Sequence, residues 1–217
     1  MKFVTDRAGV NFYLTLKRIL DILISVAMIL VMLPLMMALV LAIHWNMAAP
    51  VLFLQDRPGL NGCLFRLCKF RTMRGATGKD GSPLPDVERL TPLGRWMRRW
   101  SLDELPELFN VLKGEMSLVG PRPLLPQYLG RYTPEQARRH DVKPGLTGWA
   151  QVNGRNAITW DEKFALDVWY VENRSFLLDL KILWMTGIKV LRGEGISAAG
   201  EATMPEFMGT ETRRKDS

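Results

Sequence analysis

Residues 22–43 contain no charged side chain, and Pro34 lies near the middle of this apolar run. A straight helix of this length spans about 33 Å, close to the roughly 30 Å thickness of a bilayer core. Proline removes a backbone donor and clashes with the preceding turn, so we expect the helix to kink or break there. The run therefore predicts either a re-entrant hairpin, which enters and leaves one leaflet, or a kinked single span.

Basic residues flank the apolar run on both sides. Lys17 and Arg18 precede it, and a second group follows: Arg57, Arg66, Lys69, Arg71 and Arg74. Positive charge beside a membrane segment tends to stay in the cytoplasm, so the re-entrant hairpin, which leaves both flanks there, is favoured over the span. We expect a lead-in (1–18), a re-entrant membrane helix-break-helix (19–44), a domain on the cytoplasmic face of the inner (plasma) membrane (45–197) and a polar tail (198–217).

The net charge of the chain indicates which classes of partner it could bind. Among 217 residues, 29 Lys and Arg stand against 22 Asp and Glu, which gives a net charge of +7. This charge suits anionic lipid, nucleic acid or a phosphorylated substrate, and the apolar run favours lipid and phosphate. The chain has two cysteines, Cys63 and Cys68, and two histidines. These are few ligands for a zinc site of the His/Cys type. The sequence has neither a Walker-type loop nor a dinucleotide fingerprint, which argues against ATP and NAD sites.

Short periodic segments predict the remaining elements. Residues 51–54 and 64–70 are β-prone and enclose a turn at 58–62. Helices are expected at 133–140, where Thr133 is the cap and Pro134 the first helical residue, and at 161–171 and 177–191. Residues 143–156 are rich in glycine and are predicted to form a loop. The fold class is therefore α+β: a small, mostly helical domain with a few short strands and interfacial amphipathic helices.

Residues 89–100 are predicted to form an amphipathic helix. Its apolar positions share one face at helical spacing: Leu93, Trp96, Met97 and Trp100. The arginines of this segment lie off that face. Two interpretations stay open: a helix in the plane of the membrane interface, or a helix whose apolar face joins the core and whose basic face is solvated.

Ser101, Asp103 and Glu104 begin a predicted helix over 101–113, which Gly114 ends. Ser101 and Glu104 have the spacing of a capping box, although Pro106 also suits a later start with Asp103 as the cap. Both arrangements place two carboxylates at the positive end of a helix. Adjacent carboxylates can hold Mg²⁺ together with substrate phosphates, and one can act as a nucleophile, but pairs of this kind are more often caps.

Six motifs in this order resemble a known family. They are residues 17–21 (KRILD), 55–59 (QDRPG), 69–73 (KFRTM), 101–108 (SLDELPEL), 114–123 (GEMSLVGPRP) and 143–155 (KPGLTGWAQVNGR). The sequence resembles the bacterial sugar transferases, in particular the small monotopic phosphoglycosyl transferases that begin glycoconjugate assembly on a polyprenol carrier. Within that family the likeness is greatest to the type that transfers diacetylated bacillosamine phosphate.

The resemblance implies a two-step reaction between a UDP-sugar, with an N-acetylated amino sugar favoured, and undecaprenyl phosphate. Asp103 matches the family's nucleophile, and Glu104 matches the acid that helps to hold Mg²⁺. Lys69, Arg98 and Arg122 match basic positions that bind phosphate, and Arg155 and Asp167 are further substrate-binding candidates. Membrane lipids are expected as partners and nucleic acid is not.

One departure from the family concerns the hairpin. The family commonly breaks it at a Ser-Pro pair, whereas this chain has Leu33 before Pro34. Two other classes of function also fit the composition: a membrane-anchored adaptor with a basic domain, and a peripheral nucleic-acid binder. The adaptor has no need of the paired carboxylates, and the nucleic-acid binder leaves the apolar run unexplained.

Overall fold

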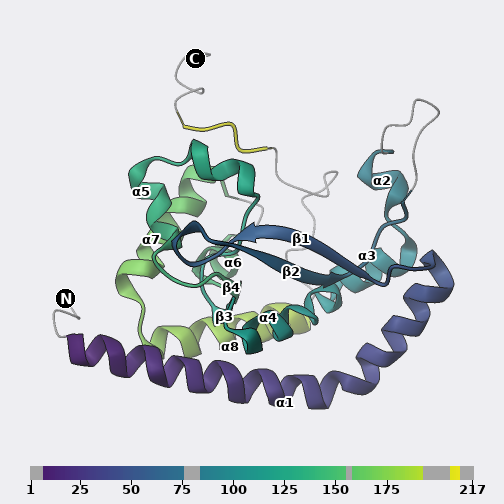
Figure 1. The fold of residues 1–217 in the computed structure, drawn as a ribbon, viewed down its shortest axis with the longest axis horizontal. Helices are drawn as coiled ribbons and strands as arrows, with labels where there is room; N and C mark the ends of the chain where they lie inside the picture. Colours follow the sequence, from purple (N-terminus) through teal and green to yellow (C-terminus); the bar gives the residue numbers. More distant parts are fainter. Residues whose placement is uncertain (1–6, 76–83, 155–157, 193–205, 211–217) are drawn as a thin grey trace.

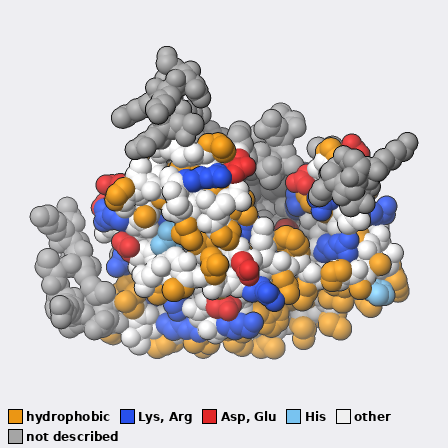
Figure 2. Space-filling model, turned by 45° about the horizontal axis from the view of Figure 1, so that its top comes forward, with side chains coloured by type: hydrophobic (Ala, Val, Ile, Leu, Met, Phe, Trp, Pro, Cys, Tyr) orange, Lys and Arg blue, Asp and Glu red, His pale blue; other side chains and the backbone are white. Residues whose placement is uncertain are grey.

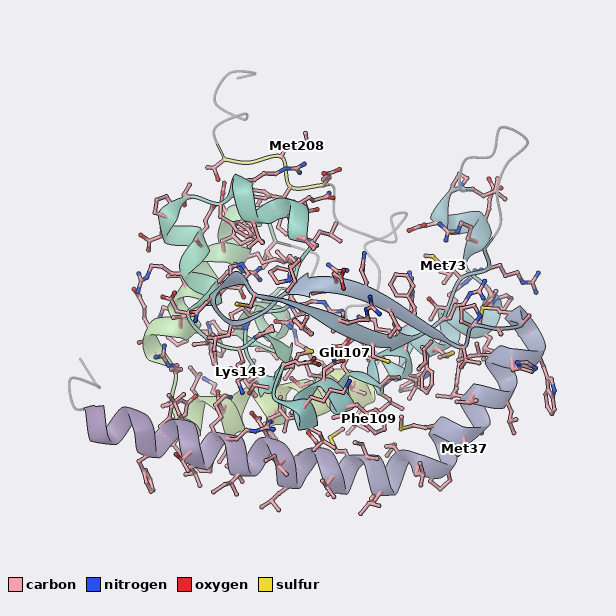
Figure 3. All side chains as sticks on the ribbon, viewed as in Figure 1. Met37, Met73, Glu107, Phe109, Lys143 and Met208 are labelled. Atoms are coloured by element: carbon pink, nitrogen blue, oxygen red, sulfur yellow. The ribbon has the colours of Figure 1, made fainter. Side chains whose placement is uncertain are left out.

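One long helix, α1 (Arg7–Met47), lies along one side of all the other elements (Figure 1). The computed structural model describes residues 7–75, 84–154, 158–192 and 206–210. Pro34 is inside α1, which bends in its second half, close to the Met37 labelled in Figure 3. The predicted helix-break-helix is therefore corrected to one continuous, bent helix. Proline removes a single hydrogen bond, and the bonds on either side of it can hold the helix together.

Polar contacts join the N-terminal half of α1 to three other elements. Lys17 Nζ lies 2.7 Å from a carboxylate oxygen of Asp179. Arg18 donates to the carbonyls of Val111 and Leu112, at 2.6 and 2.7 Å. Asp21 accepts a hydrogen bond of 3.0 Å from the backbone N–H of Leu118. The position of α1 against the rest of the protein is thus set by directed bonds as well as by apolar packing.

Most of the apolar surface of α1 faces away from the protein. By length and composition alone, Phe12–Met47 could cross a membrane, and only 17% of its most apolar 18-residue window is buried inside the structure. Met36, Leu39 and Ile43 face inward and are buried, whereas Leu30 and Val31 are exposed. Figure 2 shows apolar side chains gathered along the lower edge of the molecule. This surface favours membrane association.

The two strands predicted after the apolar run form a β-hairpin. β1 (Leu52–Pro58) pairs antiparallel with β2 (Leu64–Phe70), and a short 3₁₀ turn, η1 (Leu60–Gly62), connects them. The prediction of a strand at 64–70 after a turn at 58–62 is confirmed. Leu67 and Phe70 point to opposite faces of β2 and are buried in two different apolar clusters, Leu67 with residues of α4 and Phe70 with residues of α1.

The predicted amphipathic helix is α3 (Pro92–Arg99), which follows a single helical turn, α2 (Asp86–Arg89). Thr91 caps α3, its hydroxyl accepting from the N–H of Gly94 at 2.9 Å. Met97 is fully buried against apolar residues of α1, while Trp96 is exposed. The predicted apolar face is therefore divided: Leu93 and Met97 join the core, whereas both tryptophans, Trp96 and Trp100, are exposed.

The expected helix over 101–113 is two elements. A 3₁₀ turn, η2 (Leu102–Glu104), precedes α4 (Glu107–Lys113), whose N-cap is Pro106. The predicted capping box is wrong, because Ser101 adopts a left-handed conformation (φ 53°) and its side chain makes no capping bond. Gly114 ends α4 as predicted, with a φ of 85° that suits glycine.

The glycine-rich segment 143–156, predicted to be a loop, contains both a strand and a helix. β4 (Gly145–Thr147) pairs parallel with β3 (Ser117–Val119), and α6 (Trp149–Asn153) follows. A Cβ on Gly145 would lie 2.1 Å from the backbone nitrogen of Gly120. Glycine is therefore required here for the close approach of two backbones, a use that composition alone does not separate from a flexible loop.

The remaining elements enclose the core. They are η3 (Pro126–Arg131), α5 (Pro134–Ala137), η4 (Arg138–His140), α7 (Trp160–Asn173) and α8 (Phe176–Arg192). The helices predicted at 133–140, 161–171 and 177–191 are confirmed, including the cap at Thr133. Residues 206–210, within the expected polar tail, lie on the domain, and Phe207 is buried in an aromatic cluster with Tyr128 and Phe164.

Candidate active site

The two adjacent carboxylates differ in their contacts. Glu104 Oε1 lies 3.0 Å from Lys69 Nζ and also accepts from Arg122 Nη2. Its second oxygen lies 3.4 Å from Arg122 Nη1. Asp103, half-buried beside it, makes no hydrogen bond or ion pair with any residue that the structure describes. One carboxylate is therefore held by cations, and its neighbour is left for a ligand.

Burial and the neighbouring charges shift the pKa values of Asp103 and Glu104 in opposite directions. Burial by itself would raise the pKa of Glu104, but Arg122 and Lys69 hold this pKa well below its usual range. The pKa of Asp103 is raised, first by burial and then by the negative charge of Glu104. The cations Lys69, Arg98 and Arg122 oppose this rise. Glu104 is thus a fixed anion, whereas Asp103 gains stability when it binds an electrophile or a cation.

A third carboxylate, Glu107, belongs to the site and was not predicted from the sequence. It is buried at the start of α4, where Figure 3 labels it, and its Oε1 lies 3.0 Å from Lys69 Nζ. Burial raises the pKa of Glu107 to about 7, against the opposing charge of Lys69. The sequence did carry a signal for Glu107, namely its spacing from Glu104, since two side chains three residues apart lie on the same side of a helical turn.

The predicted phosphate-binding residues come from three elements. Lys69 lies on β2, Arg98 on α3, and Arg122 in the extended link after β3. Arg98 Nε donates to Thr72 Oγ1 at 3.1 Å, and its charge is one of those acting on Asp103. The fold therefore brings Lys69, Arg98 and Arg122 together around Asp103 and Glu104, as the prediction of one site requires.

Asp167 has a different place. It is buried on α7 and pairs with Arg139, whose Nη2 and Nε lie 2.8 and 3.1 Å from one carboxylate oxygen. The same Nη2 donates to the backbone carbonyl of Arg122 at 2.7 Å. This geometry favours a positioning role for Asp167 over the direct substrate contact predicted from the sequence. Arg155, the other candidate, lies outside the described residues.

The described residues alone offer few ligands for a metal ion. No cluster of three or more His, Cys, Asp or Glu side chains suited to a metal occurs in the described parts of the chain. Mg²⁺, however, commonly uses one or two carboxylates and takes its other ligands from phosphates and water. Asp103 fits such a site because no described residue bonds its carboxylate, whereas Glu104 would have to share with the metal the oxygens that accept from Lys69 and Arg122.

Chemically, the site combines a nucleophile candidate with several fixed positive charges. A carboxylate can attack a phosphoryl group, and ordered cations stabilise the charge that develops on its oxygens. The arrangement lies in a protein with a long apolar helix on one side (Figure 1).

Comparison with known proteins decides the family. The model of the bacterial sugar transferase family matches residues 12–193, which is most of the chain. EpsL of Bacillus subtilis, an uncharacterized sugar transferase, is 52% identical over 195 residues, covering 90% of this chain and 96% of EpsL. The chain belongs to the bacterial sugar transferase family. The predicted resemblance is confirmed at this level.

Two further members of the bacterial sugar transferase family have names that state an activity. The undecaprenyl-phosphate glucose phosphotransferase of Komagataeibacter xylinus is 43% identical over 188 residues, covering 78% of this chain and 35% of that protein. The UDP-N-acetylgalactosamine-undecaprenyl-phosphate N-acetylgalactosaminephosphotransferase of Aeromonas hydrophila is 38% identical and covers 84% and 45%. This chain spans less than half the length of either protein. The likeness to the bacillosamine type stays a prediction.

Proposed function

We propose that this bacterial sugar transferase moves a sugar 1-phosphate from a UDP-sugar to undecaprenyl phosphate, releases UMP, and so begins glycoconjugate assembly. The observation that carries the proposal is the carboxylate of Asp103, which no described residue bonds, beside Glu104, which Lys69 and Arg122 hold in place. The names of the relatives in Komagataeibacter xylinus and Aeromonas hydrophila support both the donor class and the acceptor. An N-acetylated amino sugar is the proposed donor group.

The proposed reaction has two displacements. In the first, an oxygen of Asp103 forms a bond to the β-phosphorus, the bond to the bridging oxygen breaks, and its electron pair leaves on UMP. In the second, a phosphate oxygen of undecaprenyl phosphate attacks the same phosphorus, and the carboxylate of Asp103 departs. Lys69, Arg98 and Arg122 stabilise charge on the phosphoryl oxygens in both steps.

Mg²⁺ is the proposed cofactor, with Asp103 and Glu104 as its protein ligands. When bound, it would neutralise charge on the diphosphate. Glu104 has a further task that needs no metal: its negative charge holds Lys69 and Arg122 in position beside Asp103.

The proposed location is the cytoplasmic face of the inner membrane, with α1 as a re-entrant helix. Its bend and its exposed apolar side chains support this proposal. Basic residues lie at both ends of the apolar run, which suits a helix that returns to the side where it began.

The decisive experiment uses the full chain in detergent with Mg²⁺ and a panel of UDP-sugars, with and without undecaprenyl phosphate. We expect UMP release with one donor, and without the lipid a burst stoichiometric with the enzyme. Asp103→Asn should abolish both, while Asp56→Asn, which changes an exposed carboxylate of the hairpin, should leave them unchanged. Transfer of a β-phosphate label to Asp103 should be detectable by mass spectrometry. Full activity of Asp103→Asn would exclude the mechanism.

A further inference from the structure

The hairpin presents a second basic residue on the same face as Lys69. In the register of β1 and β2, Phe53 lies opposite Lys69 and Arg57 lies opposite Phe65. Side chains alternate along a strand and paired residues share a face, so Arg57 and Lys69 project from one side of the hairpin. Asp56 and Arg66 form the pair on the opposite face.

Arg57 is half-buried and, among the described residues, lacks the carboxylate partner that Arg122 and Arg139 have. Its Nη2 donates to Gln55 Oε1 at 2.6 Å, while its Nε is buried without a hydrogen-bond partner. Among the described residues, no carboxylate forms an ion pair with Arg57. Arg122, by contrast, pairs with Glu104, and Arg139 pairs with Asp167. A buried N–H without a hydrogen-bond partner costs free energy unless a ligand supplies an acceptor.

The electrostatic surroundings place Arg57 next to the cationic site. Burial lowers the pKa of Arg57, and the positive charge of Arg122 lowers it further. Glu107 acts in the opposite direction, together with two tyrosines of the η3 region, Tyr128 and Tyr132. Arg57 and Arg122 are therefore neighbouring like charges, an arrangement that an anion bound between them would stabilise.

The position of Arg57 along the site indicates which phosphate of the donor it binds. In the register of the two strands, Arg57 lies four residues along β1 from Phe53, the partner of Lys69, and is therefore nearer to the turn η1. Lys69 contacts Glu104, the neighbour of Asp103, so Arg57 lies farther along the β1–β2 hairpin than the contact beside the nucleophile. If Asp103 attacks the β-phosphate, the group one phosphate farther along the donor is the α-phosphate.

We infer that Arg57 binds the α-phosphate of the UDP-sugar, the phosphate that leaves as part of UMP. This inference rests on the proposed function. Gln55 is the positioning residue, because its carboxamide oxygen fixes one edge of the guanidinium and leaves the other nitrogens for the ligand. Arg57 would then hold the diphosphate before the first displacement and neutralise the leaving phosphate after it.

The test is direct binding of UMP and of uridine to the full chain in detergent, measured by calorimetry. Arg57→Gln should weaken UMP binding about tenfold or more, as expected for the loss of a charge-assisted hydrogen bond, and should leave uridine binding unchanged. The UMP affinity of Arg57→Lys should fall between those of the wild type and Arg57→Gln, because lysine keeps the charge but lacks the planar fork of arginine. Arg66→Gln is the matched control: it removes an exposed arginine from the opposite face of the same hairpin and should bind UMP like the wild type.

The outcomes separate this inference from the function on which it rests. Unchanged UMP binding by Arg57→Gln would overturn the inference alone. Equal losses for UMP and uridine would also overturn it, because Arg57 would then support the nucleoside pocket or the fold; Arg57→Lys and the melting temperatures reveal a folding defect. A higher KM for undecaprenyl phosphate alone would assign Arg57 to the acceptor instead. If the wild type neither binds UMP nor releases it from any UDP-sugar, the proposed function fails and the inference fails with it.

Discussion

Arg139 holds the backbone of Arg122 in place, with its Nη2 donating to the Arg122 carbonyl at 2.7 Å. The same guanidinium is neutralised by Asp167 on α7. A buried ion pair thus fixes the main chain from which the Arg122 side chain reaches Glu104. The position of Arg122, one cation of the candidate site, therefore depends on two buried charged residues.

Asp167→Asn should destabilise the protein strongly, because it leaves Arg139 buried without a counter-ion. Loss of one partner of a buried pair costs about 3–5 kcal/mol. Glu172→Gln, on the same helix, removes the exposed partner of Arg138, whose Nη1 lies 2.8 Å away, and should change the free energy of unfolding little. Denaturant unfolding in detergent compares the two. Similar losses in both variants would contradict the structural role of Asp167.

Glu107→Gln should change how stability depends on pH. The pKa of Glu107 is about 7 in the folded protein and about 4.5 when unfolded, so the folded state holds more protons between these values. Stability of the wild type then falls as pH rises through this window, by on the order of 2 kcal/mol. A glutamine cannot ionise and removes that dependence. The melting temperature of the variant, relative to wild type, should therefore rise from pH 5 to pH 8.

The control for this titration is Glu135→Gln, which replaces an exposed carboxylate on α5. Its melting temperature should follow that of the wild type at every pH. A constant difference between Glu107→Gln and wild type across the window would show that Glu107 does not titrate there.

Phe207→Ala should loosen the contact of residues 206–210 with the domain. Phe207 is 3% exposed and its ring lies 4.9–5.8 Å, between centroids, from four aromatic rings, those of Tyr128, Tyr132, Trp160 and Phe164. Truncation of a buried phenylalanine costs about 3–5 kcal/mol, and a segment near the chain end should lie at the low end because it can detach. Limited proteolysis should then cleave the variant before the wild type. Met208→Ala, at the exposed neighbour labelled in Figure 3, should behave like the wild type.

The re-entrant form of α1 predicts that both of its ends lie on one side of the membrane. A cysteine placed at position 2 and the exposed Cys63 of the hairpin region should then be labelled from the same side of intact inner-membrane vesicles by an impermeant maleimide. Cys63→Ser and Cys68→Ser variants assign each signal. Labelling of the two positions from opposite sides would show that α1 spans the bilayer.

Local sequence was sufficient for much of the secondary structure. The hairpin, the cap at Thr133 and the end of α4 at Gly114 depend on near neighbours: alternation of side chains, a hydroxyl before a helix, and a residue that tolerates a positive φ. The family motifs predicted Asp103, Glu104, Lys69, Arg98 and Arg122 as one site, and the fold brings these five together. The apolar run predicted a helical membrane segment interrupted at Pro34, whereas the structure has one continuous, bent helix with an exposed apolar surface.

Other features depended on contacts between residues distant in sequence. Glu104 resembles half of a capping box, but Lys69 and Arg122, from two other elements, are stronger partners for a carboxylate than a backbone N–H. Gly145 of β4 looks like a loop residue in the sequence, and only the close approach of the Gly120 backbone explains it. Glu107 and Asp167 are ordinary helical acids in the sequence. Only the tertiary structure buries them beside cations, and burial is what changes the free energy of a charge.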